Sequence, residues 1–363
     1  MFMKKILQIV ETLDCGGIET LLVTLNESIS EDYHFDYLLG VNRECFYSKR
    51  VKKLGSKILY VPSRNKGILK HMKELNYFFK NNQYDVVHYN CSSLTNIFYL
   101  YYAKKYGIKK RIIHIHSVAE PASKIHLYLH KLHKCFIKFL ATDYLSCSII
   151  ASQWAFTKKI INSNRHRIIN NGIDLSKFTF DENIRKIERK NLNIGDNQIV
   201  LGCVGRFVES KNQIFCLDIM KELVKYDDYY LLLIGDGPTK KQIKEIIKNF
   251  YLEKKVTILD ATEDVGKYYQ CMDIFVFPSL YEGLGMTVIE AQISGLSSII
   301  FENLPKELNI SNNLYRMSIN SKAEEWANLI HDECKNLRNR HSIYCEEFDI
   351  RKVVKILEGV YDN

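Results

Sequence analysis

The alternation of two kinds of segment constrains the fold of this chain more than any other feature. Short apolar runs rich in β-branched residues alternate with longer amphipathic runs, a pattern typical of parallel strands joined by helices. The alternation runs through the first half of the chain and then begins again. Strands are predicted at 5–10, 35–41, 57–61, 85–89, 111–116 and 143–147, and again at 199–204, 230–234, 256–259, 274–277 and 298–301. The predicted fold class is α/β, with two doubly wound, Rossmann-like units.

Length and composition narrow the classes of protein that fit. A chain of 363 residues is longer than one core normally covers, which favours two domains. The ten cysteines are scattered without metal-ligand spacing, so we expect them to be reduced. No run reaches the roughly 18 to 20 apolar residues of a membrane span, and the apolar start lacks a cleavage site typical of a signal peptide. The sequence therefore predicts a cytoplasmic protein.

Positive charge is concentrated in the first half of the chain. Residues 1–170 contain 26 basic and 12 acidic side chains, whereas residues 171–363 contain 25 and 30. One predicted helix combines lysines with an apolar stripe at helical spacing, formed by Ile125, Leu129, Leu132, Phe136 and Phe139. The stripe fits either an anionic membrane surface or the core of the domain with a solvated basic back. Nucleic-acid binding is a weaker interpretation, because no recognised motif or stacking array accompanies the charge.

Residues 277–296 (FPSLYEGLGMTVIEAQISGL) lead from a strand through a turn into a helix. Glu282 lies in the turn and Glu290 in the opening turns of the helix, with two glycines between them. Backbone N–H groups at a helix N-terminus attract phosphate, and carboxylates accept hydrogen bonds from sugar hydroxyls. The pattern favours a charged, polyhydroxylated ligand, although either glutamate alone could be a helix cap or a solvated side chain.

Three further motifs accompany this segment in chain order: NNGIDLSKF at 170–178, VGRFVESKN at 204–212 and LLIGDGP at 232–238. Together the four motifs resemble those of family 4 retaining glycosyltransferases, which have the two-domain GT-B fold. The likeness extends over nearly the whole chain and is greatest to the branch that builds capsular and exopolysaccharides. It implies an N-terminal acceptor-side domain at 1–172, completed by a final helix at 346–363, and a C-terminal nucleotide-sugar-binding domain at 173–345.

Open α/β sheets bind ligands beyond the carboxyl ends of their strands, so a site between two sets of strand ends is expected. Arg206 and Lys211 follow a strand and are both expected to reach one diphosphate. The resemblance implies that Glu290 holds the nucleotide ribose, that Glu282 binds the donor sugar, and that the backbone of the turn contacts sugar or phosphate. The turn residues concerned are Gly283, Leu284 and Gly285.

In the first half, Gly16 and Gly17 occupy a strand-to-helix turn, and His116 ends a strand. The resemblance places the glycine turn beside the donor phosphate and acceptor, and His116 opposite the reacting sugar. His88 and His114, which are nearby in the predicted sheet, could be satisfied core residues. No D-x-D carboxylate pair follows a strand, so no metal or other cofactor is implied.

The sequence thus predicts a retaining, metal-independent glycosyltransferase of the hexosyltransferase type. Its donor would be a nucleoside diphosphate sugar, UDP-linked before GDP-linked, and its acceptor a glycan or lipid-linked glycan. The protein itself is expected to be peripheral at the inner face of the cell membrane. Two alternatives remain: a GT-B epimerase or phosphorylase that uses the same residues, and a non-catalytic subunit that binds sugar nucleotides. Oligomeric state is not predicted.

Overall fold

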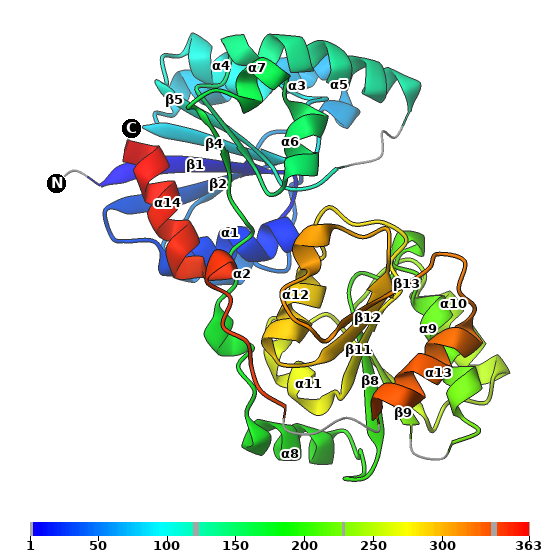
Figure 1. Cartoon of the computed structure of the whole chain (residues 1–363). Helices are drawn as coiled ribbons and strands as arrows, with labels where there is room; N and C mark the ends of the chain where they lie inside the picture. Colours follow the sequence, from blue (N-terminus) through cyan, green and yellow to red (C-terminus); the bar gives the residue numbers. More distant parts are fainter. Residues whose placement is uncertain (1–2, 119–122, 227–228, 335–339, 363) are drawn as a thin grey trace. The chain divides into compact units, whose positions relative to one another are not determined.

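The computed structural model describes residues 3–118, 123–226, 229–334 and 340–362. These residues form two compact units. The N-terminal unit comprises Met1–Ile173 and Glu346–Asn363, and the C-terminal unit comprises Asp174–Cys345. Each unit is a parallel sheet covered by helices on both faces (Figure 1). The predicted α/β class with two Rossmann-like units is confirmed. No helix in the described part of the chain is long and apolar enough to cross a bilayer.

The N-terminal unit contains a seven-stranded sheet in the order β3-β2-β1-β4-β5-β6-β7. Its strands are β1 (Lys4–Val10), β2 (Tyr33–Leu39), β3 (Ile58–Tyr60), β4 (Val86–Cys91), β5 (Lys110–Ile115), β6 (Asp143–Ser146) and β7 (His166–Ile168). Its helices are α1 (Gly17–Ser28), α2 (Ser48–Lys53), α3 (Ile68–Asn81), α4 (Phe98–Lys105), α5 (Lys124–Phe136), α6 (Ile149–Ala155), α7 (Lys158–Ile161) and α14 (Ile350–Asp362). Helices α1, α2 and α14 lie on one face of the sheet, and α3 to α7 lie on the other (Figure 1).

Helix α14 belongs to the N-terminal unit although it is the last helix of the chain. Its buried face, which includes Val353, Leu357 and Tyr361, packs against the same core as Leu21 of α1 and Phe35 of β2. An isolated bridge between Ile173 and Asp349 joins the two distant segments just before the helix begins. The helix therefore completes one hydrophobic face that the first 173 residues leave uncovered.

The C-terminal unit contains a six-stranded sheet in the order β10-β9-β8-β11-β12-β13. Its strands are β8 (Ile199–Val204), β9 (Tyr229–Ile234), β10 (Val256–Leu259), β11 (Ile274–Phe277), β12 (Ser297–Phe301) and β13 (Leu314–Met317). Its helices are α8 (Glu182–Asn191), α9 (Gln213–Leu223), α10 (Lys240–Asn249), α11 (Gly266–Cys271), α12 (Met286–Ile293) and α13 (Ala323–Cys334). Helices α9, α10 and α13 cover one face, and α8, α11 and α12 cover the other (Figure 1). Central strands such as β9 are buried throughout, as expected for a sheet covered on both faces.

The structure adds elements that the sequence pattern did not predict. Strands β7 and β13 are short, lie at the sheet edges and are not fully buried, so they lack a continuous apolar run. Helix α8 occupies the charged stretch 178–197 and is attached to the sheet through polar side chains. Arg185 and Arg189 both pair with Asp273, which directly precedes β11, at 2.5 and 3.3 Å.

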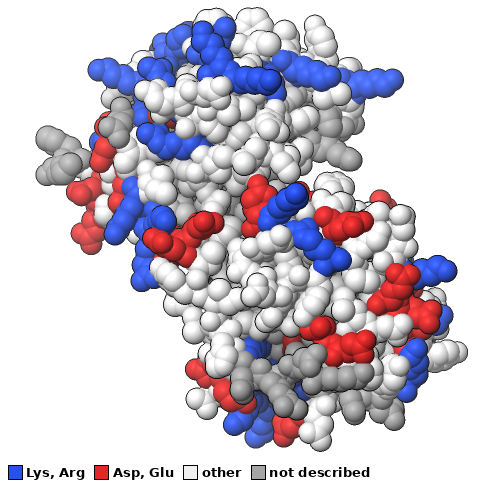
Figure 2. All heavy atoms as spheres, viewed as in Figure 1, with Lys and Arg blue, Asp and Glu red and all other residues white. Residues whose placement is uncertain are grey.

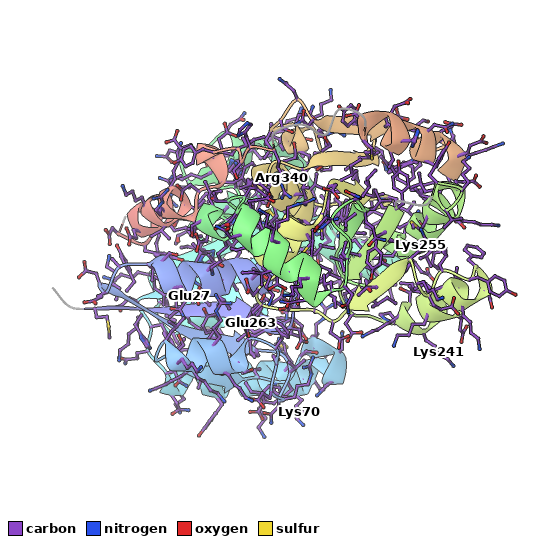
Figure 3. All side chains as sticks on the ribbon, turned by 90° about the horizontal axis from the view of Figure 1, so that it is seen from below. Glu27, Lys70, Lys241, Lys255, Glu263 and Arg340 are labelled. Carbon is purple, nitrogen blue, oxygen red and sulfur yellow. The ribbon has the colours of Figure 1, made fainter. Side chains whose placement is uncertain are left out.

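Arg340 reinforces the same region. Its guanidinium donates to the carbonyl oxygens of Ser294, Gln270, Met272 and Tyr269 at 2.6 to 3.3 Å. Figure 3 shows Arg340 among the side chains of the C-terminal unit. A partly buried guanidinium with four carbonyl acceptors satisfies backbone groups that end α11 and α12.

Candidate functional site

Most of the predicted site residues gather at the carboxyl ends of three neighbouring strands of the C-terminal unit. Strands β9, β8 and β11 are adjacent and parallel, so the loops that follow them emerge at the same edge of the sheet. Residues 205–212 follow β8, residues 235–239 follow β9, and residues 278–285 follow β11. The carboxyl edge of this sheet is therefore where three of the four sequence motifs meet.

Two glycines allow the first two loops to touch. Gly235 has a φ of 152°, and a Cβ atom there would lie 2.0 Å from the carbonyl oxygen of Gly205. Gly237 has a φ of 156°, and its Cβ would lie 2.2 Å from the carbonyl oxygen of Phe207. Both positions exclude a side chain by backbone conformation and by contact. The loop after β8 is thus supported by the loop after β9.

The loop after β11 is joined to the loop after β8 by hydrogen bonds. The backbone N–H of Leu280 and the hydroxyl of Ser279 both donate to the carbonyl oxygen of Ser210, at 2.8 and 3.0 Å. This connection brings Lys211 next to Glu282, and the two form an ion pair. The Lys211 ammonium also lies 5.2 Å from the centre of the Phe277 ring. Lys211 and Glu282, which the sequence assigned to different parts of a ligand, are direct partners in the structure.

Arg206 presents a contrast to Lys211. Its side chain is exposed, and it makes no hydrogen bond or ion pair with any residue that the structure describes. Its backbone is held, because Nε2 of Gln213 donates to its carbonyl oxygen at 3.0 Å. A guanidinium fixed at its base and unpaired at its tip is suited to a bidentate anionic ligand.

The N-terminus of α12 provides backbone donors beside these side chains. Gly285 caps the helix with a φ of 95°, a conformation that favours glycine. The N–H groups of Gly283, Leu284 and Gly285 donate to no acceptor among the described residues. Unpaired N–H groups and the helix dipole both favour a negatively charged group at this position.

Glu290 lies one turn into α12, where Oε2 of its carboxyl group accepts a hydrogen bond of 2.8 Å from the Tyr269 hydroxyl. Burial raises the pKa of Glu290 to about 7, and the hydrogen bond from Tyr269 opposes that rise. The Tyr269 hydroxyl also lies 3.2 Å from the carbonyl oxygen of Thr287. Glu290 is therefore held in one orientation by a tyrosine of α11, and the sequence analysis did not identify that tyrosine.

In the N-terminal unit, His116 is buried and both of its ring nitrogens have partners. Nδ2 of Asn90 donates to Gln8, so Oδ1 of Asn90 accepts from Nε2 of His116 at 2.9 Å. Nδ1 of His116 lies 3.2 Å from the side-chain amide of Asn171. Burial lowers the pKa of His116 to about 4, so its ring is neutral near pH 7.

His116 is part of a longer buried polar network. Its ring centre lies 3.8 Å from that of His114, and Nδ1 of His114 lies 3.2 Å from Nε2 of His88. Nδ1 of His88 is 2.9 Å from the hydroxyl of Tyr361 on α14. The interpretation of His88 as a satisfied core residue agrees with these contacts. Asn90, Asn171 and Tyr361 were missed because an isolated amide or phenol in a sequence gives no sign of its partner.

Gly16 and Gly17 form the turn between β1 and α1. Gly16 is extended, with a φ of −161°, and Gly17 is the first residue of α1. A Cβ at Gly17 would meet no atom within 4 Å, whereas one at Gly16 would lie 2.4 Å from a carboxylate oxygen of Glu19. The space beside Gly17 is open, which leaves the backbone of this turn accessible.

Comparison with known proteins shows which proteins the chain resembles. Residues 184–343 match the family model described as glycosyl transferases group 1. A capsular polysaccharide biosynthesis glycosyltransferase, CapH of Staphylococcus aureus, is 24% identical over 99% of this chain and 99% of its own length. An Escherichia coli UDP-Gal:alpha-D-GlcNAc-diphosphoundecaprenol alpha-1,3-galactosyltransferase is 26% identical over 76% of this chain and 78% of its own.

A solved structure shows the same fold. Anabaena HepE, crystallised with UDP and glucose, superposes with a TM-score of 0.80 at 15% identity, and the match covers 99% of this chain and 100% of HepE. The fold of this chain is that of the GT-B glycosyltransferases.

Proposed function

We propose that this chain, a glycosyltransferase whose residues 184–343 match the group 1 glycosyl transferases, transfers a hexose-type sugar from a nucleoside diphosphate. The proposed acceptor is a hydroxyl of a lipid-linked glycan in capsule or exopolysaccharide synthesis. The printed names of the capsular and diphosphoundecaprenol relatives support that acceptor class. A UDP-linked donor is favoured over a GDP-linked one, because HepE was crystallised with UDP.

The observation that supports this proposal most is the combination of unpaired donors after β8 and β11. Arg206 has no partner among the described side chains, and the N–H groups of Gly283 to Gly285 are unpaired beside it along the same sheet edge. Positive charge and backbone donors at fixed positions stabilise a diphosphate as negative charge develops on it. The cations would supply this stabilisation without a divalent metal.

Each remaining residue has a proposed role. Lys211 would turn from Glu282 toward the diphosphate, which would release the Glu282 carboxylate for the donor sugar. Glu290 would accept from the ribose hydroxyls, with Tyr269 holding its carboxyl group. Gly16 and Gly17 would border the donor phosphate and acceptor. His116 was also predicted to face the reacting sugar, but it is buried and enclosed by Asn90 and Asn171, so no contact with the sugar is assigned to it.

We expect the reaction to retain anomeric configuration. The bond between the anomeric carbon and the diphosphate oxygen breaks, and the acceptor oxygen bonds to that carbon on the same face. The acceptor proton passes to the leaving diphosphate. No described side chain at this edge stands out as a covalent nucleophile, which favours this front-face route over a double displacement. NMR of the product anomer would test retention, and unchanged turnover after chelator treatment would support metal independence.

The central test is the turnover of Arg206→Ala at saturating donor. Loss of a fixed positive donor is expected to reduce kcat by roughly 10²-fold, on the scale of other preorganised donors. The melting temperature should stay unchanged, because the side chain is exposed and unpaired. Lys241→Ala is the matched control, since Lys241 is 90% exposed at the periphery of the same unit (Figure 3).

Lys211→Ala should reduce kcat by a similar factor and should also lower the melting temperature, because it removes the cation that pairs with the largely buried Glu282. Near-parental turnover in Arg206→Ala would contradict the assignment. Tight donor binding by the parent without turnover on any acceptor or on water would instead support a sugar-nucleotide-binding subunit.

A further inference from the structure

Helix α5 packs against the rest of its unit through polar side chains, whereas an ordinary amphipathic helix packs through its apolar side chains. Its only fully buried residue is His130, which stacks on Trp154 with ring centres 4.0 Å apart. Nδ1 of His130 accepts from the N–H of Leu94 at 3.1 Å, and its Nε2 donates to the carbonyl oxygen of Trp154 at 3.0 Å. Lys134 donates to the carbonyl oxygen of Gln153 at 2.6 Å. Polar side chains therefore attach this helix to the unit.

Most side chains of the apolar stripe face solvent instead, whereas Leu129 is partly buried. Ile125 is 70% exposed, Tyr128 is 67% exposed and Phe136 is 49% exposed, and Phe139, in the 3-10 turn that follows α5, is 56% exposed. Leu132 is exposed as well. The interpretation of the Ile125–Phe139 stripe as a core-facing surface is therefore wrong. Exposed apolar side chains at this density on one helix indicate a surface that is covered in use.

The apolar surface continues onto α6, which packs against α5. Ile149 and Ile150 are both more than half exposed. Ile149 also lines a hollow of about 610 Å³ together with Lys134, Phe156 and Lys158. We call the exposed apolar side chains of α5, of the 3-10 turn that follows it and of α6 the α5–α6 face: Ile125, Tyr128, Leu132, Phe136, Phe139, Ile149 and Ile150.

The charge around the α5–α6 face has one sign. Between residues 121 and 173 the sequence has a single acidic residue, Asp143, and eight basic residues. Asp143 is paired with Lys110 at 2.9 Å, so it does not offset the lysines of α5. Lys124, Lys131 and Lys138 are exposed beside the apolar side chains. Figure 2 shows Lys and Arg side chains gathered along the upper edge of the N-terminal unit.

We propose that the α5–α6 face is a membrane-docking surface whose occupant is an anionic phospholipid bilayer. The lysines would contact lipid phosphates, and the aromatic and aliphatic side chains would enter the boundary between headgroups and acyl chains. A second copy of the chain fits this face less well, because pairing two such faces would bring the same lysines together. No residue of the candidate site lies on the face, so the proposal stands apart from the proposed reaction.

Sedimentation with vesicles of phosphatidylcholine, with and without phosphatidylglycerol, tests the proposal. We expect binding only when phosphatidylglycerol is present. The double variant Lys131→Glu/Lys138→Glu should weaken binding roughly ten-fold or more, since each lysine near an anionic surface contributes about 1 kcal/mol. Leu132→Ser/Phe136→Ser should weaken it by a comparable factor, and this loss should persist at high salt, which screens only the electrostatic part.

Matched controls come from exposed residues of the C-terminal unit. Lys186→Glu/Lys241→Glu changes the same charge, and Ile187→Ser/Tyr251→Ser removes similarly exposed apolar side chains. Both controls should bind vesicles as the parent does. All variants should hydrolyse soluble donor at the parental rate, so loss of vesicle binding alone would separate this proposal from the proposed function.

A tryptophan placed on the face reports insertion directly. The emission added by Tyr128→Trp should shift to shorter wavelength when anionic vesicles are added, whereas that added by Tyr251→Trp should not. Parental vesicle binding in both α5 double variants would overturn the proposal. The proposal would also be overturned if the parent did not bind vesicles but formed a dimer that Leu132→Ser/Phe136→Ser dissociates. A second copy of the chain would then be the occupant of the face.

Discussion

At the scale of single residues, the site depends on which charges have partners. Arg206 and Lys211 are five positions apart in the sequence and look equivalent there, yet only Lys211 has a carboxylate partner. Glu282 supplies that partner from a loop 71 positions away. In the structure as it stands, the pair neutralises one of the two cations expected to bind the diphosphate. Donor binding would therefore exchange one ion pair for another, whereas Arg206 needs no such exchange.

Glu290 gives a prediction about pH. Its pKa is raised by burial to about 7 in the folded protein, above the value of 4.5 for a solvated glutamate. The unfolded chain therefore releases this proton at lower pH than the folded chain does. The protonated Glu290 carboxyl group therefore adds to the free energy of unfolding below about pH 4.5, and this contribution is lost as the pH rises through about 7.

Glu290→Gln removes this titration while keeping an amide oxygen that accepts from Tyr269. We expect the melting temperature of the parent, relative to that of Glu290→Gln, to fall between pH 5 and pH 7 and to level off above that. Thermal melts of both proteins across this range provide the measurement. A constant difference between them would show that burial does not shift this carboxyl group.

At the scale of elements, two helices are attached by polar contacts rather than by an apolar face. Helix α5 is attached through His130 and Lys134, and α8 through Arg185 and Arg189. The apolar Ile187 of α8 is more than half exposed. Hydrophobic periodicity indicates where a helix packs only when the packing is apolar, so it fails for both helices.

The attachment of α8 can be tested at Asp273, which pairs with both arginines and accepts from the N–H of Val200 at 2.7 Å. Asp273→Ala leaves the buried Arg189 guanidinium without its carboxylate and should lower the free energy of unfolding by about 3–5 kcal/mol. Asp264→Ala is the control, because Asp264 is 69% exposed and its ion pair with Lys267 is long, at 3.9 Å. This substitution should change the free energy of unfolding by no more than about 0.5 kcal/mol. Hydrogen exchange in β8 and β11 measures both variants, and equal effects would show that the Asp273 pairs do not stabilise the unit.

At the scale of the whole molecule, the last helix of the chain, α14, contributes to the stability of the N-terminal unit, whose other residues come from the start of the chain. Leu357 is fully buried in the core shared with β1 and β2, whereas its neighbour Ile356 is 38% exposed. Leu357→Ala should destabilise the N-terminal unit by about 2–5 kcal/mol, and Ile356→Ala should have a much smaller effect.

Hydrogen exchange followed by mass spectrometry can locate this effect. Peptides from β1 and β4 should exchange faster in Leu357→Ala, and peptides from β8 and β11 should exchange as in the parent, because each unit has its own core. Faster exchange confined to the C-terminal unit would contradict the assignment of α14 to the N-terminal unit.

Local pattern in the sequence was sufficient to predict the α/β class, the parallel sheets and the loops that carry the candidate site. Strands β8 and β11 lie where the sequence predicts them, because buried parallel strands are continuous apolar runs. The edge strands β7 and β13 were not predicted, because an edge strand is only partly buried and its residues need not be apolar.

Only the tertiary structure decided which side chains meet. The pairing of Lys211 with Glu282, the support of Glu290 by Tyr269 and the enclosure of His116 between Asn90 and Asn171 all join residues that are far apart in the chain. The direction of the apolar face of α5 was equally undetermined, since a stripe at helical spacing is the same whether a core or a membrane covers it. Periodicity is a property of neighbouring residues, whereas partner choice depends on how distant segments pack, and that information is not local.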